Sequence, residues 1–165
     1  MNADAQLGGK MYYIGIDLGT SAVKLLLMEE SGKICNIVSK EYPLFFPHPG
    51  WSEQNPEDWF TQSVEGMKEL TEGIDRSKVA GIGFGGQMHG LVTLDENDKV
   101  IRPAILWNDG RSQKETEYLN NEIGKDKLSA YTANIAFAGF TAPKILWMKK
   151  NEPDKFAKIA KIMLP

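Results

Sequence analysis

The sequence predicts a mixed α/β domain whose twisted sheet starts with a three-stranded antiparallel meander and is flanked by helices. Three observations predict this class. Residues 12–42 hold three runs of β-forming residues joined by short turns that contain Gly19 and Gly32. An apolar helical stripe follows, and further short apolar runs precede more helical segments. The resulting order, in which three successive strands precede the first helix and further strands follow it without helices between them, differs from the strict βαβ alternation of a dinucleotide-binding domain.

The first half of the chain divides at its turns and prolines. We expect strands over 12–17, 23–28 and 34–42, and a proline-rich loop over 43–55. A helix should begin at Pro56, because Asn55 is a favoured N-cap and proline is favoured at the first helical position. Apolar residues then recur at steps of three or four at Phe60, Val64, Met67, Leu70 and Ile74.

The second half of the chain predicts shorter elements. Short apolar runs predict strands at 79–84, 91–94, 100–101 and 103–107. Helical segments are expected at 111–123, where Gly124 ends the helix, and at 143–150 and 153–162. Residues 163–165 have the composition of a strand that is just beginning.

Composition excludes several classes of protein. With 165 residues, the chain has material for about one domain or part of one. Its 19 basic and 22 acidic residues argue against bulk attraction to nucleic acid or to an anionic membrane. One cysteine, Cys35, excludes an internal disulfide framework, and with only two histidines a zinc cluster is not expected. No apolar run approaches the ~20 residues of a membrane-spanning helix.

The first ten residues lack the apolar centre of a signal peptide. We therefore expect residues 1–10 to be a disordered leader or an expression remnant. A reducing, cytoplasmic setting is the expected localisation.

The first motif with chemical content is the segment from Asp17 to Lys24. An acid closes a strand, Gly19 permits a tight turn, and Thr20 and Ser21 supply hydroxyl groups before the next strand. Such a turn suits the terminal phosphates of a nucleotide, with Asp17 available to a hydrated Mg²⁺. The alternative is a plain β-hairpin with a polar turn.

The second motif is a glycine-rich run over 81–90. Residues 81–86 fit G-x-G-x-x-G, but they lie inside a predicted strand and another strand follows, so dinucleotide binding is rejected. Glycines at a strand end allow a ligand or another strand to approach closely. Gln87 and His89 then offer donors and acceptors at the edge where α/β proteins commonly bind ligands. Taken alone, a histidine at position 89 more often has a structural role than a ligand contact.

The third motif follows the strand at 103–107. It places Trp107 beside Asn108, Asp109 and Arg111, and a tryptophan face can pack against the C–H surface of a sugar. For Asp109 and Arg111 we favour a structural interpretation, in which Asp109 caps the next helix and pairs with Arg111.

In this order and spacing, five segments resemble the amino-terminal part of the FGGY carbohydrate kinases, which share an actin-like, ribonuclease H-like ATPase fold. The segments are IGIDLGTSAVK, HPGWSEQNPEDW, GFGGQMHG, RPAILWNDGR and GFTAPKILW. The resemblance implies that residues 11–165 are the amino-terminal part of the first kinase domain.

The resemblance also implies roles for individual residues. It assigns ATP-phosphate contacts to Asp17, Gly19, Thr20, Ser21 and Lys24, with Asp17 holding Mg²⁺ through water. It assigns sugar contacts to Gln87, Met88, His89, Trp107 and Phe140. Glycerol kinases carry an Arg-Glu pair where this chain has Met-His, which implies a ketopentose substrate. The expected reaction is the ATP-dependent phosphorylation of D-xylulose to D-xylulose 5-phosphate.

The family is much longer than this chain. The resemblance places the catalytic base beyond Pro165, together with the adenine pocket and a second domain, so no catalytic residue is assigned within the chain. The isolated chain is therefore expected to be inactive, and a homodimer is possible by resemblance alone. Two alternatives stay open: a related kinase acting on ribulose, gluconate or glycerol, or a non-catalytic actin-like module that binds a nucleotide or a protein partner.

Overall fold

The computed structural model describes residues 10–165, so the expected leader lies outside the described residues except for Lys10. The chain forms two compact units. Unit 1 runs to Glu41 and resumes over Phe60–Gly86, whereas unit 2 comprises Tyr42–Trp59 and Gln87–Pro165. The boundary passes through helix α1 (Pro56–Leu70), between Trp59 and Phe60.

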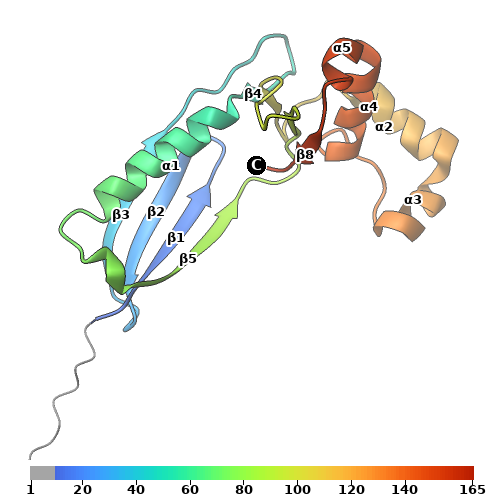
Figure 1. The fold of residues 1–165 in the computed structure, drawn as a ribbon. Helices are drawn as coiled ribbons and strands as arrows, with labels where there is room; N and C mark the ends of the chain where they lie inside the picture. The colour runs from blue at the N-terminus through green and yellow to red at the C-terminus, as the bar shows by residue number, and fades with distance from the viewer. Residues whose placement is uncertain (1–9) are drawn as a thin grey trace, which may run out of the picture. The chain divides into compact units, whose positions relative to one another are not determined.

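Unit 1 contains a four-stranded mixed sheet (Figure 1). Its strands, in order across the sheet, are β3 (Ile34–Glu41), β2 (Ala22–Glu29), β1 (Tyr12–Leu18) and β5 (Val79–Gly86). The first three form the antiparallel meander predicted from the sequence, and β5 joins β1 in parallel. The strand ends differ from those expected by a few residues at most.

One face of this sheet is covered by α1, which lies along the strands in Figure 1. The helix approaches β2 closely at Gly66, where an added Cβ would come within 2.6 Å of Leu25 Cδ1. Side chains alternate along β1, so the buried Ile14 and Ile16 face α1 and Asp17 faces the opposite side. A short 3₁₀ turn, η1 (Arg76–Lys78), then leads into β5.

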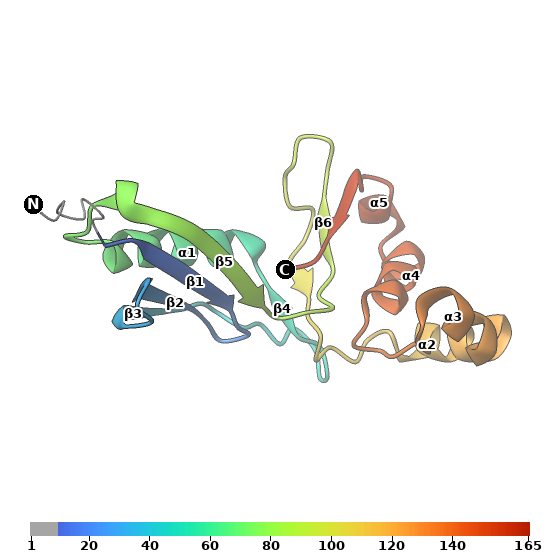
Figure 2. The same cartoon turned by 90° about the horizontal axis from the view of Figure 1, so that it is seen from below.

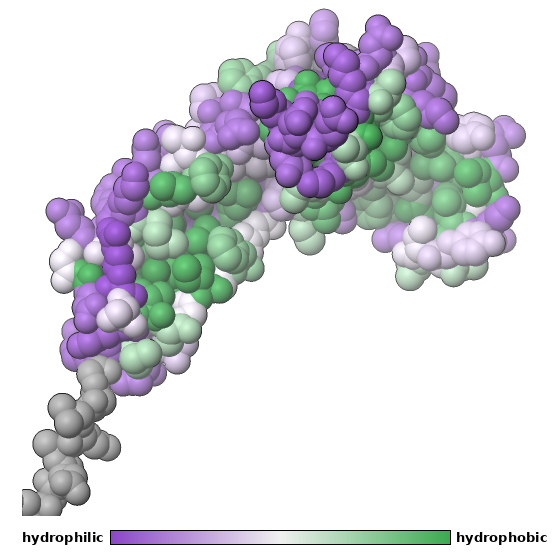
Figure 3. Space-filling view, in the orientation of Figure 1, coloured by the Kyte–Doolittle hydropathy of each residue, from purple (hydrophilic) through white to green (hydrophobic). Residues whose placement is uncertain are grey.

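The apolar stripe of α1 extends beyond the part of the helix that is packed. Leu70 is buried, but Phe60 is 69% exposed. Together with Ile82 and Phe84 on β5, Phe60 lines an open groove of about 590 Å³. Figure 3 shows hydrophobic side chains gathered over this part of unit 1. The periodicity therefore predicts the helix correctly, while part of the stripe remains at the surface.

Unit 2 is built from short elements (Figure 2). It contains two small antiparallel sheets. One pairs β4 (Glu53–Gln54) with β7 (Ala104–Ile105), and the other pairs β6 (Val92–Leu94) with β8 (Lys161–Met163). Its helices are α2 (Gln113–Tyr118), the π-helical turn η2 (Leu119–Gly124), α3 (Lys125–Thr132), α4 (Thr141–Asn151) and α5 (Pro153–Phe156). No helix of the described residues is long and apolar enough to cross a membrane.

Several predicted elements of unit 2 are wrong because distant segments pair. The helix expected over 153–162 ends at Phe156, and Lys161–Met163 forms β8 against β6. The predicted loop 43–55 includes β4, which pairs with β7. The strand expected at 100–101 is reduced to an isolated bridge between Leu94 and Val100.

The prediction at Gly124 is confirmed only in part. Gly124 has φ +95°, the left-handed region that favours glycine, and the helical segment before it ends there. A helix that was not predicted, α3, begins at the next residue, Lys125. None of the α3 residues is buried, so this helix lacks the apolar stripe by which a helix is recognised in a sequence.

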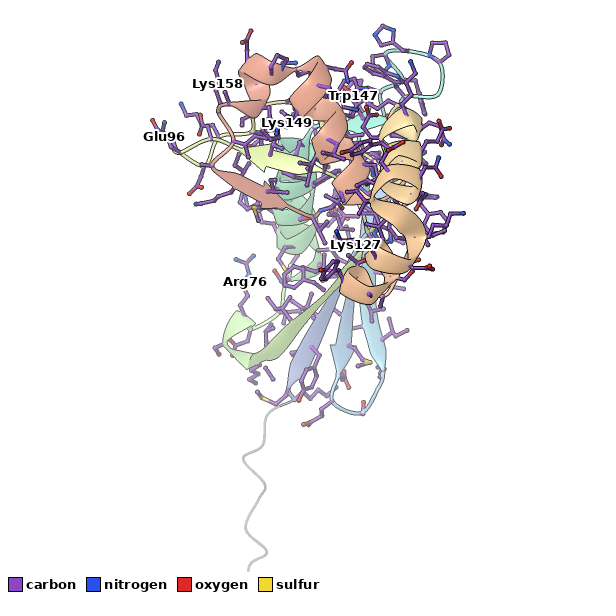
Figure 4. All side chains as sticks on the ribbon, turned by 90° about the vertical axis from the view of Figure 1, so that its right-hand side faces the viewer. Arg76, Glu96, Lys127, Trp147, Lys149 and Lys158 are labelled. Carbon is purple, nitrogen blue, oxygen red and sulfur yellow. The ribbon has the colours of Figure 1, made fainter. Side chains whose placement is uncertain are left out.

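A buried ionic cluster lies beside the apolar core of unit 2. Arg111 Nη2 lies 2.8 Å from Asp109 Oδ2, and Arg111 Nη1 lies 2.7 Å from Glu53 Oε1. The guanidinium also lies 3.7 Å from the ring centroid of Trp51. Trp147, labelled on α4 in Figure 4, also packs near this guanidinium, with its ring centroid 5.0 Å away. The predicted pairing of Asp109 with Arg111 is thus confirmed. The predicted helix cap at Asp109 is wrong, because α2 begins at Gln113 and its N-cap is Ser112.

We predict that Asp109→Ala lowers the free energy of unfolding by about 3–5 kcal/mol, because it removes one of the two carboxylates that pair with the buried Arg111 cation and leaves only Glu53. It also removes the acceptor of the Ser52 backbone N–H, which donates to Asp109 Oδ2 at 2.6 Å. Urea denaturation followed by tryptophan fluorescence measures the change. The matched control is Asp126→Ala, because Asp126 is an exposed carboxylate on α3, a helix with no buried residue. Equal midpoints for the two variants would contradict the prediction.

Candidate functional site

The end of strand β1 and the turn after it carry the residues expected to contact phosphate. Asp17 lies directly opposite Lys24 in the β1–β2 register, and both side chains are exposed. The Gly19 N–H donates to the Ala22 carbonyl at 3.1 Å, which closes the turn. An added Cβ at Gly19 would come within 3.0 Å of that carbonyl oxygen, so a side chain there would be tightly crowded.

The glycine-rich end of β5 lies beside this turn. Gly85 is the parallel-register partner of Asp17, and an added Cβ there would meet nothing within 4 Å. Gly86 approaches β1 more closely, since its added Cβ would come within 3.0 Å of the Leu18 carbonyl oxygen. The backbone next to Asp17 therefore has no side chain above it, and a ligand can approach it closely.

This edge of unit 1 combines a carboxylate, an ammonium group and the hydroxyl groups of Thr20 and Ser21, which lie in the turn. The described residues contain no group of three or more side chains that could hold a metal ion directly. A single exposed carboxylate at Asp17 fits a hydrated Mg²⁺, which keeps most of its water and is bound through one or two carboxylates plus phosphate oxygens.

In unit 2, Gln87 lies in the segment after β5 and is held in place by Gln54. The Gln87 Nε2 donates to Gln54 Oε1 at 3.0 Å, and the Trp59 indole N–H donates to the same oxygen at 3.1 Å. Gln87 Oε1 is buried without a hydrogen-bond partner among the described residues. The next side chain, Met88, is 65% exposed. The structure thus fixes the amide of Gln87 and leaves Met88 at the surface.

His89 has an unusual backbone and a defined ring contact. Its φ of 63° lies in the left-handed region, which is uncommon for a residue other than glycine. Its imidazole stacks on the Phe140 ring, with centroids 4.4 Å apart and planes inclined by 23°. The His89 carbonyl accepts hydrogen bonds from Thr141 Oγ1 at 3.3 Å and from Lys144 Nζ at 2.7 Å.

Lys144 is fully buried, and sequence reasoning missed it. Its ammonium also donates to the Gly139 carbonyl at 2.6 Å, so it connects the His89 segment with the loop before α4. Burial lowers the pKa of Lys144 to about 8, while Asp109 acts to raise it and Arg111 to lower it. Helical spacing was the available signal, because Lys144 shares a face of α4 with the buried Trp147 and Met148.

Trp107 lies next to the same loop. An added Cβ at Gly139 would come within 2.5 Å of the Trp107 carbonyl oxygen, so the loop passes directly against the Trp107 backbone. The Trp107 side chain is 48% exposed. A pocket of about 450 Å³ lies beside the stacked rings, and its lining includes His89, Phe140 and Thr141.

The structure places the ten predicted site residues in two sets. Unit 1 carries those expected to contact phosphate, and these are Asp17, Gly19, Thr20, Ser21 and Lys24. Unit 2 carries those expected to contact sugar, and these are Gln87, Met88, His89, Trp107 and Phe140. Within unit 2, flat ring surfaces lie close to fixed polar groups. This combination suits a small ligand with several hydroxyl groups.

Comparison with known proteins gives consistent matches. Over 156 residues the chain is 47% identical to a xylulose kinase from Bacillus subtilis, covering 93% of this chain and 31% of the relative. A solved xyloylose kinase from Brucella ovis is 44% identical with a TM-score of 0.87, covering 93% of this chain and 32% of that one. A solved gluconate kinase from Lactobacillus acidophilus is 30% identical, also with a TM-score of 0.87, covering 94% and 31%.

These matches confirm the expected actin-like α/β fold. The chain spans about a third of the length of the curated relatives it matches. The profile described as the FGGY family of carbohydrate kinases, N-terminal domain, matches residues 12–165. This chain therefore belongs to the FGGY family of carbohydrate kinases.

Proposed function

We propose that the polypeptide containing this chain transfers the γ-phosphoryl group of ATP to a hydroxyl of D-xylulose, giving D-xylulose 5-phosphate. The observation that carries the proposal is the arrangement in unit 2 of a chain 47% identical to a xylulose kinase: the stacked rings of His89 and Phe140 line a pocket, and the Trp107 backbone lies against the loop before Phe140. Four further curated relatives, 42–46% identical to this chain, are also xylulose kinases.

In this proposal, unit 2 binds and orients the sugar. The imidazole of His89 donates or accepts a hydrogen bond with a sugar hydroxyl, and its stacking on Phe140 holds the ring in one orientation. Trp107 offers a half-exposed indole face to the C–H surface of the sugar. Phosphoryl transfer depends largely on such positioning, because the protein does little covalent chemistry.

Unit 1 binds the phosphates of ATP in this proposal. The turn through Gly19 and the glycine-rich end of β5 leave backbone open to phosphate oxygens, and Lys24 and the two hydroxyl groups of the turn add donors. Asp17 holds Mg²⁺ through water. When bound, the ion neutralises charge that develops on the transferred phosphoryl group.

The remainder of the polypeptide supplies what unit 1 and unit 2 lack. We assign the catalytic base, which accepts the proton of the attacking hydroxyl, and the adenine pocket to residues beyond Pro165. No residue of this chain is assigned as the base, because Asp17 has a role toward Mg²⁺ and Asp109 is committed to the Arg111 ion pair.

The whole polypeptide is expected to phosphorylate D-xylulose with a kcat/KM at least about tenfold above that for D-ribulose, gluconate or glycerol, because buried polar groups discriminate strongly between hydroxyl patterns. A coupled assay of ADP release measures this, with the 165-residue chain alone as the inactive control. A preference for gluconate would instead favour the activity of the Lactobacillus acidophilus gluconate kinase. Absence of activity on all four compounds would favour a non-catalytic binding module.

Replacing His89 by alanine in the whole polypeptide should raise the KM for D-xylulose about tenfold while changing kcat less, because a sugar hydroxyl loses its partner in a partly buried site. Steady-state kinetics at saturating ATP test this. His48→Ala is the matched control, since His48 is the other histidine and is exposed. An unchanged KM in His89→Ala would remove His89 from the sugar site.

Asp17→Asn keeps the shape of the side chain but removes its charge, so it should lower kcat at least about tenfold at a fixed Mg²⁺ concentration. Raising the Mg²⁺ concentration should restore part of the loss. Glu30→Gln, in the exposed β2–β3 turn of the same unit, is the control for a general change of charge. Wild-type kinetics in Asp17→Asn would show that this carboxylate does not act on the metal–nucleotide complex.

A further inference from the structure

Lys144 stands out among the groups that the proposed function does not use. It is a lysine with a fully buried side chain, and it lies on α4, which carries none of the proposed sugar contacts. A lysine is rarely buried without partners, because removing an ammonium group from water costs several kcal/mol. The cost is offset here by two short, charge-assisted hydrogen bonds, both to backbone carbonyls.

The two carbonyls belong to segments far apart in the sequence. Lys144 Nζ lies 2.7 Å from the carbonyl oxygen of His89 and 2.6 Å from that of Gly139. Each carbonyl lies within one residue of a ring in the His89–Phe140 stack. The ammonium of Lys144 therefore connects the backbones that carry both rings.

The His89 backbone needs such a connection. Its φ of 63° is disfavoured for a residue with a Cβ, and such a conformation persists only where surrounding contacts enforce it. Lys144 and Thr141 both bind the carbonyl of this residue. On the other side, Gly139 is held against the Trp107 backbone, where no side chain fits. One buried cation thus joins the segments of His89, Phe140 and Trp107.

We infer that Lys144 is a positioning residue for the sugar site, which holds His89 and Phe140 in their stacked arrangement without itself touching the sugar. This inference rests on the proposed function only for the identity of the ligand. The positioning role itself is a property of this chain, and it can be measured without sugar.

The first experiment compares Lys144→Met with wild type by NMR of the 165-residue chain. The His89 ring protons lie over Phe140, so its ring current displaces their signals, and Phe140→Leu provides the unstacked reference. We expect the His89 signals of Lys144→Met to move to the reference position while those of His48 stay fixed. Lys149→Met is the matched control, because Lys149 is exposed on the same helix and labelled in Figure 4. Unmoved His89 signals in a folded Lys144→Met chain would overturn the inference.

The second experiment measures kinetics of the whole polypeptide. Lys144→Met should raise the KM for D-xylulose about tenfold, with a smaller effect on kcat and on the KM for ATP, whereas Lys149→Met should change none of them. Displaced His89 signals with an unchanged KM would leave the positioning role intact and would contradict the proposed sugar contact. The two failures are therefore distinguishable.

If Lys144→Met does not fold, a pH titration of the wild-type chain tests the positioning role of Lys144. Raising the pH through about 8 removes the charge of Lys144 and weakens both of its hydrogen bonds. The charged groups that act on it are Asp109 and Arg111. We expect the Phe140 ring signals to move together with the signal of the ¹³C-labelled Lys144 Cε, while those of Phe60, in unit 1, do not follow. Phe140 signals that stay fixed as Lys144 titrates would overturn the inference.

Discussion

The guanidinium of Arg111 is buried in unit 2, and its need for partners determines the arrangement of a large part of that unit. Asp109 and Glu53 supply the compensating carboxylates, while Trp51 and Trp147 cover the cation with their rings. A buried cation without such partners costs several kcal/mol, so the segments that carry these residues are held at fixed distances. Glu53 also pairs with Arg102, and Arg102 with Glu152 after α4, which extends the same network to the far end of that helix.

The position of α4 in turn determines the geometry of the proposed sugar site. Trp147 contacts the ionic cluster, and Lys144, one turn earlier on the same helix, binds the carbonyls beside His89 and Phe140. The electrostatics are linked as well, because Asp109 and Arg111 act on the pKa of Lys144 in opposite directions. Unit 1 is built differently. Its glycines leave the protein backbone uncovered next to the exposed carboxylate of Asp17.

Local sequence patterns predict unit 1 better than unit 2, and the reason is the range of the interactions. The meander from Tyr12 to Glu41 pairs neighbouring strands through short turns, so alternation and glycine positions suffice to predict it. In unit 2, Ile162 lies at a helical spacing from Phe156 and Ile159 but pairs with Thr93, a partner that no local pattern reveals. The site shows the same limit. His89 and Trp107 were visible as motifs, whereas the burial of Lys144 depends on carbonyls 5 and 55 residues away.

The proposed sugar contacts lie in unit 2 around the His89–Phe140 stack. Hydrogen–deuterium exchange of the whole polypeptide, with and without D-xylulose and in the absence of nucleotide, tests this placement most directly. We expect slower exchange on sugar binding in peptides covering residues 87–90, 107–108 and 138–141, and little change over 17–24. Protection confined to 17–24, or unchanged exchange in all three unit 2 segments at saturating D-xylulose, would contradict it.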